Sequence, residues 1–374
     1  MLLNDVCNKR VLLRADLANA DRYPHKINHL IPTIITLLQQ GCGICIMSSM
    51  GIAFMPQVSS ARSVYNKLNE MLHQEVHWVD YFLDISMENG QIYFIENPYH
   101  DTRDRECPQG MVSEVEAYFD VVVHDTLNQL DKEFATSFGL LGSKTPQVIG
   151  RYLEDVEAGV QSFRQSKIGL ILGGTQVALQ LRLVRQLSSQ LSFLAVGGEL
   201  ALVMMGKGQE MPGSLHDDIL MTINMLRAEK VKVLYPVDVV AYSQETQRNR
   251  ICLYQDLDSA EAVKDLATQS RNRILSQIEK DKVNVVIFSG AVGQHLDPRY
   301  SRGTDILIQD LARLSHKKVL IGKDVALAAK RLSVLGGYQL VLEGNTMELD
   351  FIASGDQSIL SWLSKDIGIE SDLC

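Results

Sequence analysis

Short runs of apolar residues alternate along the chain with longer segments in which apolar residues recur at helical spacing. The short runs are continuous rather than interrupted by polar residues, which is typical of strands covered on both faces of a parallel sheet. Strands are expected at residues 11–13, 44–47, 92–95, 121–123, 168–172, 193–196, 231–234, 283–288 and 319–321. Helices are expected at residues 32–40, 62–73, 111–118, 177–190, 217–229, 260–280, 304–315 and 325–333.

This alternation of strand and helix predicts βαβ units and doubly wound α/β sheets. Nine strands fit two open sheets better than one, and the 374 residues are enough for two domains at about 150 residues each. Residues 150–165 have the pattern of an amphipathic helix that connects the two halves. We therefore expect an N-terminal domain at 1–150 and a C-terminal domain at 151–345.

Composition and charge narrow the class of protein. The chain is 46% apolar and 22% charged, and its 36 Lys and Arg against 45 Asp and Glu give a net charge of −9. This balance argues against a protein that binds nucleic acid by neutralising phosphates, whereas a small phosphorylated ligand needs only a few local cations. No apolar run reaches the roughly 18 residues of a membrane helix, and no secretory signal is evident. We expect a cytoplasmic protein that binds neither nucleic acid nor membrane.

Two of the six cysteines, Cys42 and Cys45, form a C-x-x-C motif, which is found in redox pairs and in zinc sites. The motif lies at the start of an expected buried strand, where residues i and i+3 point to opposite faces. No second Cys or His pair stands at zinc spacing. The two residues are predicted to be inert core thiols, and redox chemistry stays open as the alternative.

Several expected strands of the second half end in glycine, at Gly173-Gly174, Gly197-Gly198, Gly290 and Gly322. Glycine at the carboxyl end of a parallel strand lets a ligand approach the backbone and leaves a helix N-terminus free to hold an anion. The alternative for each one is a tight turn between strand and helix. Four such turns in one domain favour a phosphate or nucleotide crevice, although neither a G-x-G-x-x-G fingerprint nor a P-loop is present.

A series of further motifs follows in order along the chain. It comprises KRVLLRAD at 9–16, DVVVHD at 120–125, LILGGTQV at 170–177, YPVDVVA at 235–241, FSGAVG at 288–293, RGT at 302–304, GKDVALAAKRL at 322–332 and LEGN at 342–345. Each motif alone has low specificity. The ordered series, however, resembles the phosphoglycerate kinase family over almost the whole chain.

The resemblance implies two Rossmann-like, doubly wound parallel-sheet domains joined by a helix and hinge, with a tail at 346–374 that returns to the N-terminal domain. It implies that 3-phosphoglycerate binds to the first domain and Mg-ATP or Mg-ADP to the second. Hinge closure would then bring them together for in-line phosphoryl transfer in glycolysis. The expected form is a cytoplasmic monomer whose partners are a small phosphorylated substrate and an adenine nucleotide.

The same resemblance assigns roles to individual residues. It assigns substrate binding to Asp16, Lys26 and Lys132. It assigns nucleotide binding to Gly173, Gly174, Gly322, Lys323 and Asp324. Asp324 is the expected metal-side acid, and Lys26 and Lys323 are the expected catalytic cations. For Lys323, a solvated loop lysine is the alternative.

On the substrate side, many cations of the family pattern are replaced. The Asn of R-x-D-x-N is Ala18, with Asn19 one place late, and a substrate arginine is Lys26. Ile52 stands at the arginine of S-H-L-G-R-P. Tyr99 stands at another arginine position, for which Arg103 is a nearby substitute.

On the nucleotide side, both lysines of G-G-x-K-V-x-x-K are glutamines, Gln176 and Gln180, and Leu296 replaces the ribose-binding glutamate. Phosphoryl transfer depends mostly on positioning and on cationic stabilisation of the transferred group. The sequence therefore predicts a phosphotransferase with altered or reduced activity. The alternative is a non-catalytic family member that acts as a binding or regulatory protein.

Overall fold

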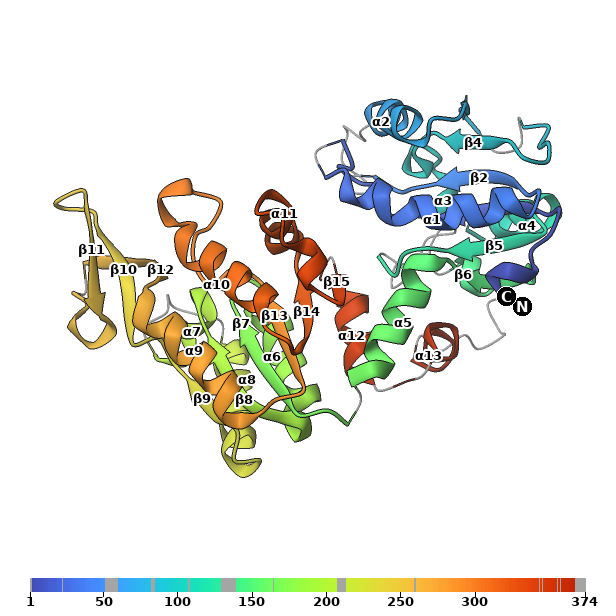
Figure 1. The fold of residues 1–374 in the computed structure, drawn as a ribbon. Coiled ribbons are helices and arrows are strands. Elements are labelled where there is room, and N and C mark those ends of the chain that lie inside the picture. The colour runs from blue at the N-terminus through green and yellow to red at the C-terminus, as the bar shows by residue number, and fades with distance from the viewer. Residues whose placement is uncertain are drawn as a thin grey trace. The chain divides into compact units, whose positions relative to one another are not determined.

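The computed structural model describes residues 2–21, 23–50, 60–81, 85–106, 108–128, 139–163, 165–206, 213–258, 260–342, 344, 346–354, 356 and 358–366. The chain divides into two compact units (Figure 1). Unit 1 comprises Met1–Ala158 and Asp356–Cys374, and unit 2 comprises Gly159–Gly355. The boundary between them falls inside helix α5 (Arg151–Phe163).

Unit 1 is built on a six-stranded parallel sheet with the strand order β3-β4-β2-β1-β5-β6. Its strands are β1 (Arg10–Arg14), β2 (Gly43–Met47), β3 (Val76–Val79), β4 (Ile92–Ile95), β5 (Val121–His124) and β6 (Gln147–Ile149). Besides the first part of α5, its helices are α1 (His25–Gln39), α2 (Arg62–Leu72), α3 (Arg103–Glu106), α4 (Pro108–Tyr118) and α13 (Ile359–Asp366).

The strands of unit 1 are apolar on both sides because the sheet has a buried core on each face. Leu13 of β1 packs in one core together with Ile34 of α1. Its neighbour Leu12 packs in the other core with Val115 of α4. Successive residues of one strand thus enter different cores, which explains the continuous apolar run.

The C-x-x-C motif divides between these two cores. Cys42 lies in the core that contains Leu13, and Cys45 lies in the core that contains Leu12. Both side chains are fully buried. Burial raises the pKa of both thiols, so that neither is a ready thiolate. The prediction that the two cysteines face opposite sides of the sheet is confirmed.

Unit 2 contains a second six-stranded parallel sheet, with the order β15-β14-β13-β7-β8-β9. Its strands are β7 (Ile168–Leu172), β8 (Leu191–Val196), β9 (Lys232–Leu234), β13 (Val285–Ser289), β14 (Lys317–Ile321) and β15 (Leu340–Leu342). Its helices are α6 (Val177–Leu187), α7 (Gly198–Met204), α8 (Gly213–Ala228), α9 (Thr268–Asp281), α10 (Arg302–Arg313), α11 (Lys323–Arg331) and α12 (Thr346–Ser354).

A three-stranded antiparallel sheet at one end of unit 2 was not expected from the sequence (Figure 1). Its order is β11-β10-β12, with β10 (Asp238–Ser243), β11 (Arg248–Leu253) and β12 (Glu261–Leu266). The single helix expected at 260–280 is therefore wrong in its first part. The buried Asp238 carboxyl accepts hydrogen bonds from the Gln269 and Ser270 amides at 2.9 and 2.7 Å, and so caps α9 where it begins.

All nine expected strands are present in the two parallel sheets, with small differences at their ends. The predicted α/β class with two parallel sheets is thus confirmed. Strands β3, β6 and β15, of three or four residues each, were not expected from the sequence. Among the residues that the structure describes, no helix is long and apolar enough to cross a membrane.

Candidate functional site

Glycine turns converge at the carboxyl edge of the parallel sheet in unit 2. A Cβ atom on Gly173, which follows β7, would lie 2.1 Å from the carbonyl oxygen of Ala291. One on Gly290, which follows β13, would lie 2.5 Å from the carbonyl oxygen of Gly173. These positions require glycine because the backbones of neighbouring turns touch.

The amides of these turns are already engaged by one another. The Gly174 amide donates to the Ala291 carbonyl at 2.6 Å, and the Gly290 amide donates to the Ile321 carbonyl at 3.0 Å. The Gly322 amide likewise donates to the Leu342 carbonyl at 3.0 Å. The glycines thus bring the turns together, but these three amides are not free donors for an anion. The role of these glycines in tight turns explains their presence without a ligand.

A cavity of about 970 Å³ opens beside these turns within unit 2. It lies between the turns after β7, β8 and β13 and the antiparallel strand β12. Its lining consists of Gly174, Thr175, Gly198, Glu199, Leu202, Leu257, Asp258, Glu261, Ala262, Val263, Lys264, Ala291, Val292, Gly293 and Gln294. This volume lies at the upper end of the range of about 300–1,000 Å³ that is usual for small-molecule sites. We call it the unit 2 pocket.

Charged residues in the lining of this pocket are mostly acidic: Glu199, Asp258 and Glu261 stand against Lys264. Glu261 is ion-paired with Arg250 at 2.6 Å. The Lys264 ammonium donates to the Gln294 side chain at 3.1 Å. It also lies 5.8 Å from the ring centroids of two tyrosines, Tyr242 and Tyr300. The one lysine of the lining is therefore held by three neighbouring side chains.

Sequence reasoning did not single out Glu199, Glu261 or Lys264. The signal for Glu199 was its place directly after Gly197-Gly198. No comparable signal was available for Glu261 and Lys264, because their segment was interpreted as a helix rather than as β12.

Helix α6 begins beside the pocket and carries the two glutamines that replace family lysines. Gln176, at its N-cap position, is exposed and makes no capping hydrogen bond through its side chain. Gln180 is only 6% exposed, and its amide nitrogen donates to the Gly173 carbonyl. Its side-chain oxygen has no hydrogen-bond partner among the described residues. Neither glutamine supplies a positive charge at this edge of the sheet.

The residues expected on the metal side begin helix α11. Gly322, with φ of +123°, is its N-cap, Lys323 opens the helix, and Asp324 is exposed in the first turn. A Cβ on Gly322 would lie 3.7 Å from the Gly290 amide, so this helix start lies next to the converging turns. Among the described residues, no group of three His, Cys, Asp or Glu side chains is arranged to hold a metal ion. Asp324 therefore stands as a single carboxylate.

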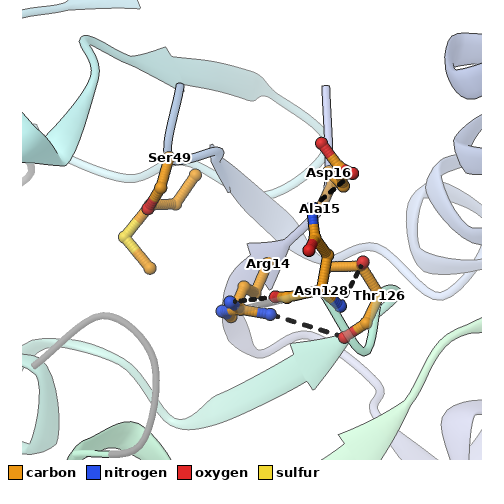
Figure 2. A pocket seen from close by; sticks show the side chains of 7 residues that line it. Arg14, Ala15, Asp16, Ser49, Thr126 and Asn128 are labelled. Carbon is orange, nitrogen blue, oxygen red and sulfur yellow. Dashed lines mark hydrogen bonds between the residues drawn. The ribbon is translucent and has the colours of Figure 1, made fainter. Parts of the chain in front are cut away.

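In unit 1, Asp16, expected to bind substrate, lies after the carboxyl end of β1 (Figure 2), and Lys26 lies in the first turn of α1. The Lys26 ammonium forms an ion pair with Asp16 at 2.9 Å, and the side chains of Lys26 and Asp16 are only 1% and 7% exposed. Asp16 also accepts hydrogen bonds from the Asn128 side-chain amide at 2.7 Å and from the Ala18 amide at 3.1 Å. The structure thus brings Asp16 and Lys26 together as a buried pair.

Arg14 is turned toward the loop after β5. Its guanidinium donates to the Thr126 carbonyl at 3.4 Å and to the Asn128 carbonyl at 2.7 Å (Figure 2). The cavity between Arg14, Asp16, Ser49 and this loop is only about 10 Å³, which is room for a single water molecule. Among the described residues that line it, the polar groups are mainly hydrogen-bonded to one another.

The structure describes some, but not all, of the other positions of unit 1 at which the family pattern has a basic residue. Arg103, the substitute considered for Tyr99, pairs with Asp101 at 2.7 Å and with Glu114 at 3.0 Å. Lys132 and Ile52 lie outside the described residues.

Two fully buried titratable groups follow one another at the end of β5. Burial raises the pKa of Asp125 to about 7, although the Thr33 hydroxyl donates to it at 3.0 Å and the Tyr152 amide at 3.1 Å. Burial and the nearby Arg14 charge lower the pKa of His124 to about 4. Asp125 joins β5 to the start of α5, and His124 lies 2.6 Å from the Gln147 side-chain oxygen.

These shifts predict opposite dependences of stability on pH. Between about pH 4 and 6.5, folded Asp125 holds a proton that the unfolded chain releases, so its contribution to the free energy of unfolding falls as pH rises. His124 is neutral when folded and protonated when unfolded, so its contribution rises. In Asp125→Asn, the contribution of His124 is no longer offset. We expect the free energy of unfolding of this variant, relative to that of the parent protein, to rise by roughly 3 kcal/mol across this window.

Urea unfolding at several pH values checks this expectation. The pH dependence is taken as a difference from the parent protein, so that the other titrating groups cancel. His124→Gln should shift the pH dependence in the opposite direction, and the double variant should follow the parent. Parallel curves for the parent and both single variants would contradict the opposing titrations.

The sequence of this chain is similar to those of known phosphoglycerate kinases. A family model described as phosphoglycerate kinase matches residues 3–364. The chain is 24% identical over 361 residues to the phosphoglycerate kinase of Baumannia cicadellinicola, with 92% of each covered. It is 23% identical over 368 residues to that of Francisella tularensis subsp. novicida, with 93% of each covered.

Solved structures share the fold. The phosphoglycerate kinase of Coxiella burnetii matches with a TM-score of 0.79 at 19% identity, covering 98% of this chain and all of that one (100%). The enzyme of Pyrococcus horikoshii matches with a TM-score of 0.78 at 17% identity, covering 98% of each chain. The two-sheet α/β architecture is therefore common to all three proteins.

Proposed function

Because this chain belongs to the phosphoglycerate kinase family, we propose that its unit 2 pocket binds an adenine nucleotide and that unit 1 binds a phosphorylated acid. We further propose that the chain transfers a phosphoryl group between 3-phosphoglycerate and ATP far more slowly than a typical kinase. The cytoplasm is the proposed location, as is usual for this family.

The nucleotide assignment is supported by the shape and position of the pocket. It lies at the carboxyl edge of a parallel sheet, which is where α/β proteins bind ligands. Leu202, Leu257 and Val292 provide apolar surface for a base, and Gly174 allows close approach at one side. The volume of about 970 Å³ is sufficient for a nucleotide.

The magnesium ion that the family uses fits the residues present in part. Mg²⁺ is usually bound by one or two carboxylates together with substrate phosphates, and Asp324 is a single exposed carboxylate beside the glycine turns. Asp324 would hold the ion, with Lys323 as the adjacent cation. Bound there, Mg²⁺ would neutralise charge on the phosphates.

The single observation that supports the low rate is the position of the Gln180 side chain inside the fold. A family lysine at this position would place a positive charge near the transferred group, whereas the Gln180 amide donates to the Gly173 carbonyl inside the fold. A cation at the transferring phosphoryl group is worth on the order of 10³–10⁵ in rate. In unit 1, the candidate cation Lys26 is paired with Asp16.

A coupled assay with Mg-ATP and 3-phosphoglycerate tests the proposal. We expect turnover at least about 10³-fold below the roughly 1–100 s⁻¹ of typical kinases. Turnover within about tenfold of that range would show that groups other than these supply the missing charge, and the proposal of a low rate would be wrong. An active family enzyme measured beside it controls for the coupling system.

A second candidate function is a binding or regulatory protein that uses the same scaffold without catalysis. The burial of Gln180 and of the Asp16–Lys26 pair favours it, because these side chains contact other parts of the fold at positions where the family places ligand contacts. Nucleotide binding by calorimetry together with no detectable turnover would distinguish this role from slow catalysis.

A further inference from the structure

The two cysteines of the C-x-x-C motif do not face each other, but one of them lies next to a third cysteine. Cys45 is buried in the core that contains Leu12, whereas Cys42 is buried in the core on the other face of the sheet. The Cys42 thiol donates to the Val6 carbonyl at 2.5 Å. Val6 is bonded to Cys7, whose thiol is free and exposed. The thiol within reach of Cys42 is therefore that of Cys7 rather than that of Cys45.

The contact between Cys42 and Val6 limits the distance between the two sulfur atoms. One peptide unit separates the Val6 carbonyl oxygen from the Cys7 Cα, so standard covalent geometry places the Cys7 and Cys42 Sγ atoms at most about 8 Å apart, and their Cα atoms at most about 8 Å apart as well. Burial raises the pKa of Cys42, and the charge of nearby Cys7 adds to the rise. A disulfide requires Cα atoms about 4.4–6.8 Å apart. A shift of a few ångströms by the Cys7 backbone is therefore sufficient to join the two residues.

The segment that carries Cys7 is held against the end of α1 by a small number of hydrogen bonds. The Val6 amide donates to the Gln40 side-chain oxygen at 3.0 Å, and the Asn8 amide donates to the Gln40 carbonyl at 3.0 Å. The Cys7 thiol donates to the same side-chain oxygen at 3.8 Å. Cys7 and Asn8 form an exposed turn, in which Asn8 has φ of +54°. Such a turn opens locally at a much smaller cost in free energy than the sheet beneath it.

We propose that Cys7 and Cys42 are a thiol pair that a low-molecular-weight disulfide, such as oxidised glutathione, converts into an internal disulfide. In the first step, the Cys7 thiolate attacks one sulfur of oxidised glutathione, the S–S bond breaks, and one glutathione thiolate leaves. In the second step, the Cys42 thiolate attacks the Cys7 sulfur and releases the other glutathione thiolate. The two protein thiols are oxidised, the glutathione disulfide is reduced to two thiols, and these take up the two protons that the protein loses.

The two cysteines have different roles because their exposure differs. Cys7 is exposed, so it meets the oxidant first, whereas the fully buried Cys42 reacts only with a group already inside the fold. The resulting bond joins the segment before β1 to the segment before β2. These strands pair in parallel from Arg10 and Gly43 onward. The disulfide thus fastens the amino end of this ladder, and it is a modification site of unit 1 that does not depend on the proposed nucleotide site.

Incubation of the full chain with oxidised glutathione, followed by blocking of the remaining thiols and peptide mass spectrometry without reduction, tests this proposal. Trypsin places Cys7 in the peptide 1–9 and both Cys42 and Cys45 in the peptide 27–62, and the other cysteines fall in other peptides. Fragmentation spectra distinguish Cys42 from Cys45. We expect the two peptides to be linked through Cys7 and Cys42 in the monomeric protein, and dithiothreitol should separate them.

Three variants separate the two steps. Cys42→Ala should stop at the mixed disulfide between Cys7 and glutathione, because the second thiol is missing. Cys7→Ser should leave Cys42 unmodified under the conditions that link the parent protein. Cys45→Ala is the matched control, since it removes another fully buried thiol of the same tryptic peptide from the other core. It should form the Cys7–Cys42 bond as the parent does.

The parent protein alone is enough to overturn the pair, so the result does not depend on the folding of any variant. Glutathione that stays on Cys7 in the parent would show that Cys42 is out of reach. A bond from Cys7 to Cys45, or between the Cys7 residues of two chains, would overturn the pairing as well. Oxidation of Cys42 in Cys7→Ser at the parent rate would show that Cys7 is not the thiol that meets the oxidant first.

Discussion

Replacing Gln176 and Gln180 together by lysine is expected to raise the affinity for Mg-ADP by at least about a hundredfold. A hydrogen bond to a charged group contributes about 1.5–3 kcal/mol, so two of them are worth about 10²–10⁴ in affinity. The new side chains would restore positive charge at the start of α6, next to the Gly173-Gly174 turn. Calorimetry with Mg-ADP measures the change.

The matched control uses the same substitution at and just beyond the other end of this helix, because Gln190 lies in the 3₁₀ turn Ser188–Gln190 that follows α6. Gln186 and Gln190 have the same spacing as Gln176 and Gln180, and Gln186 is exposed. Converting this second pair to lysine adds equal charge away from the turns, and we expect less than a twofold change. Equal effects from the two pairs, or none from either, would show that the phosphates do not lie at the start of α6.

Removing the charge of Lys26 is expected to destabilise unit 1 strongly. In Lys26→Met, the Asp16 carboxylate remains buried without its ionic partner, and breaking a buried pair in this way costs about 3–5 kcal/mol. The pair is 2.9 Å apart, with the two side chains 1% and 7% exposed. Urea unfolding followed by circular dichroism measures the loss.

Two further variants separate charge from packing. Lys67→Met removes an exposed lysine that pairs with Glu70 at 2.8 Å, with side chains 33% and 69% exposed, and should cost less than about 1 kcal/mol. Lys26→Met combined with Asp16→Asn removes both buried charges and should recover part of the loss. A Lys26→Met effect as small as that of Lys67→Met would mean that the Asp16–Lys26 pair does not stabilise the fold.

The strands of the two parallel sheets were predictable because burial on both faces requires continuous apolar sequence. Strand β12 was not, because Glu261 and Lys264 lie on a half-exposed antiparallel strand whose polar residues fit a helix equally well. Because β12 was taken for a helix, the side of the unit 2 pocket that this strand forms was not predicted. Only the glycines that end the parallel strands indicated a ligand site there.

The candidate site shows the same limit for individual side chains. Motif comparison placed Asp16 and Lys26 on the substrate side, but their mutual ion pair depends on how the loop after β1 and helix α1 fold together. Likewise, four glycine-ended strands favoured a ligand approaching the backbone. The structure shows that the Ala291 carbonyl occupies the space beside Gly173, and that the Gly173 carbonyl occupies the space beside Gly290. Sequence spacing does not reveal which neighbour occupies such space.

The cysteines offer independent reporters of the two units. Cys42 and Cys45 are fully buried in unit 1, and Cys252, 8% exposed, is buried in the antiparallel sheet of unit 2. An alkylating reagent reaches such thiols only when the surrounding structure opens, so the rate of labelling measures the free energy of that opening. Peptide mass spectrometry of partly alkylated protein therefore resolves whether the two units unfold together or one before the other.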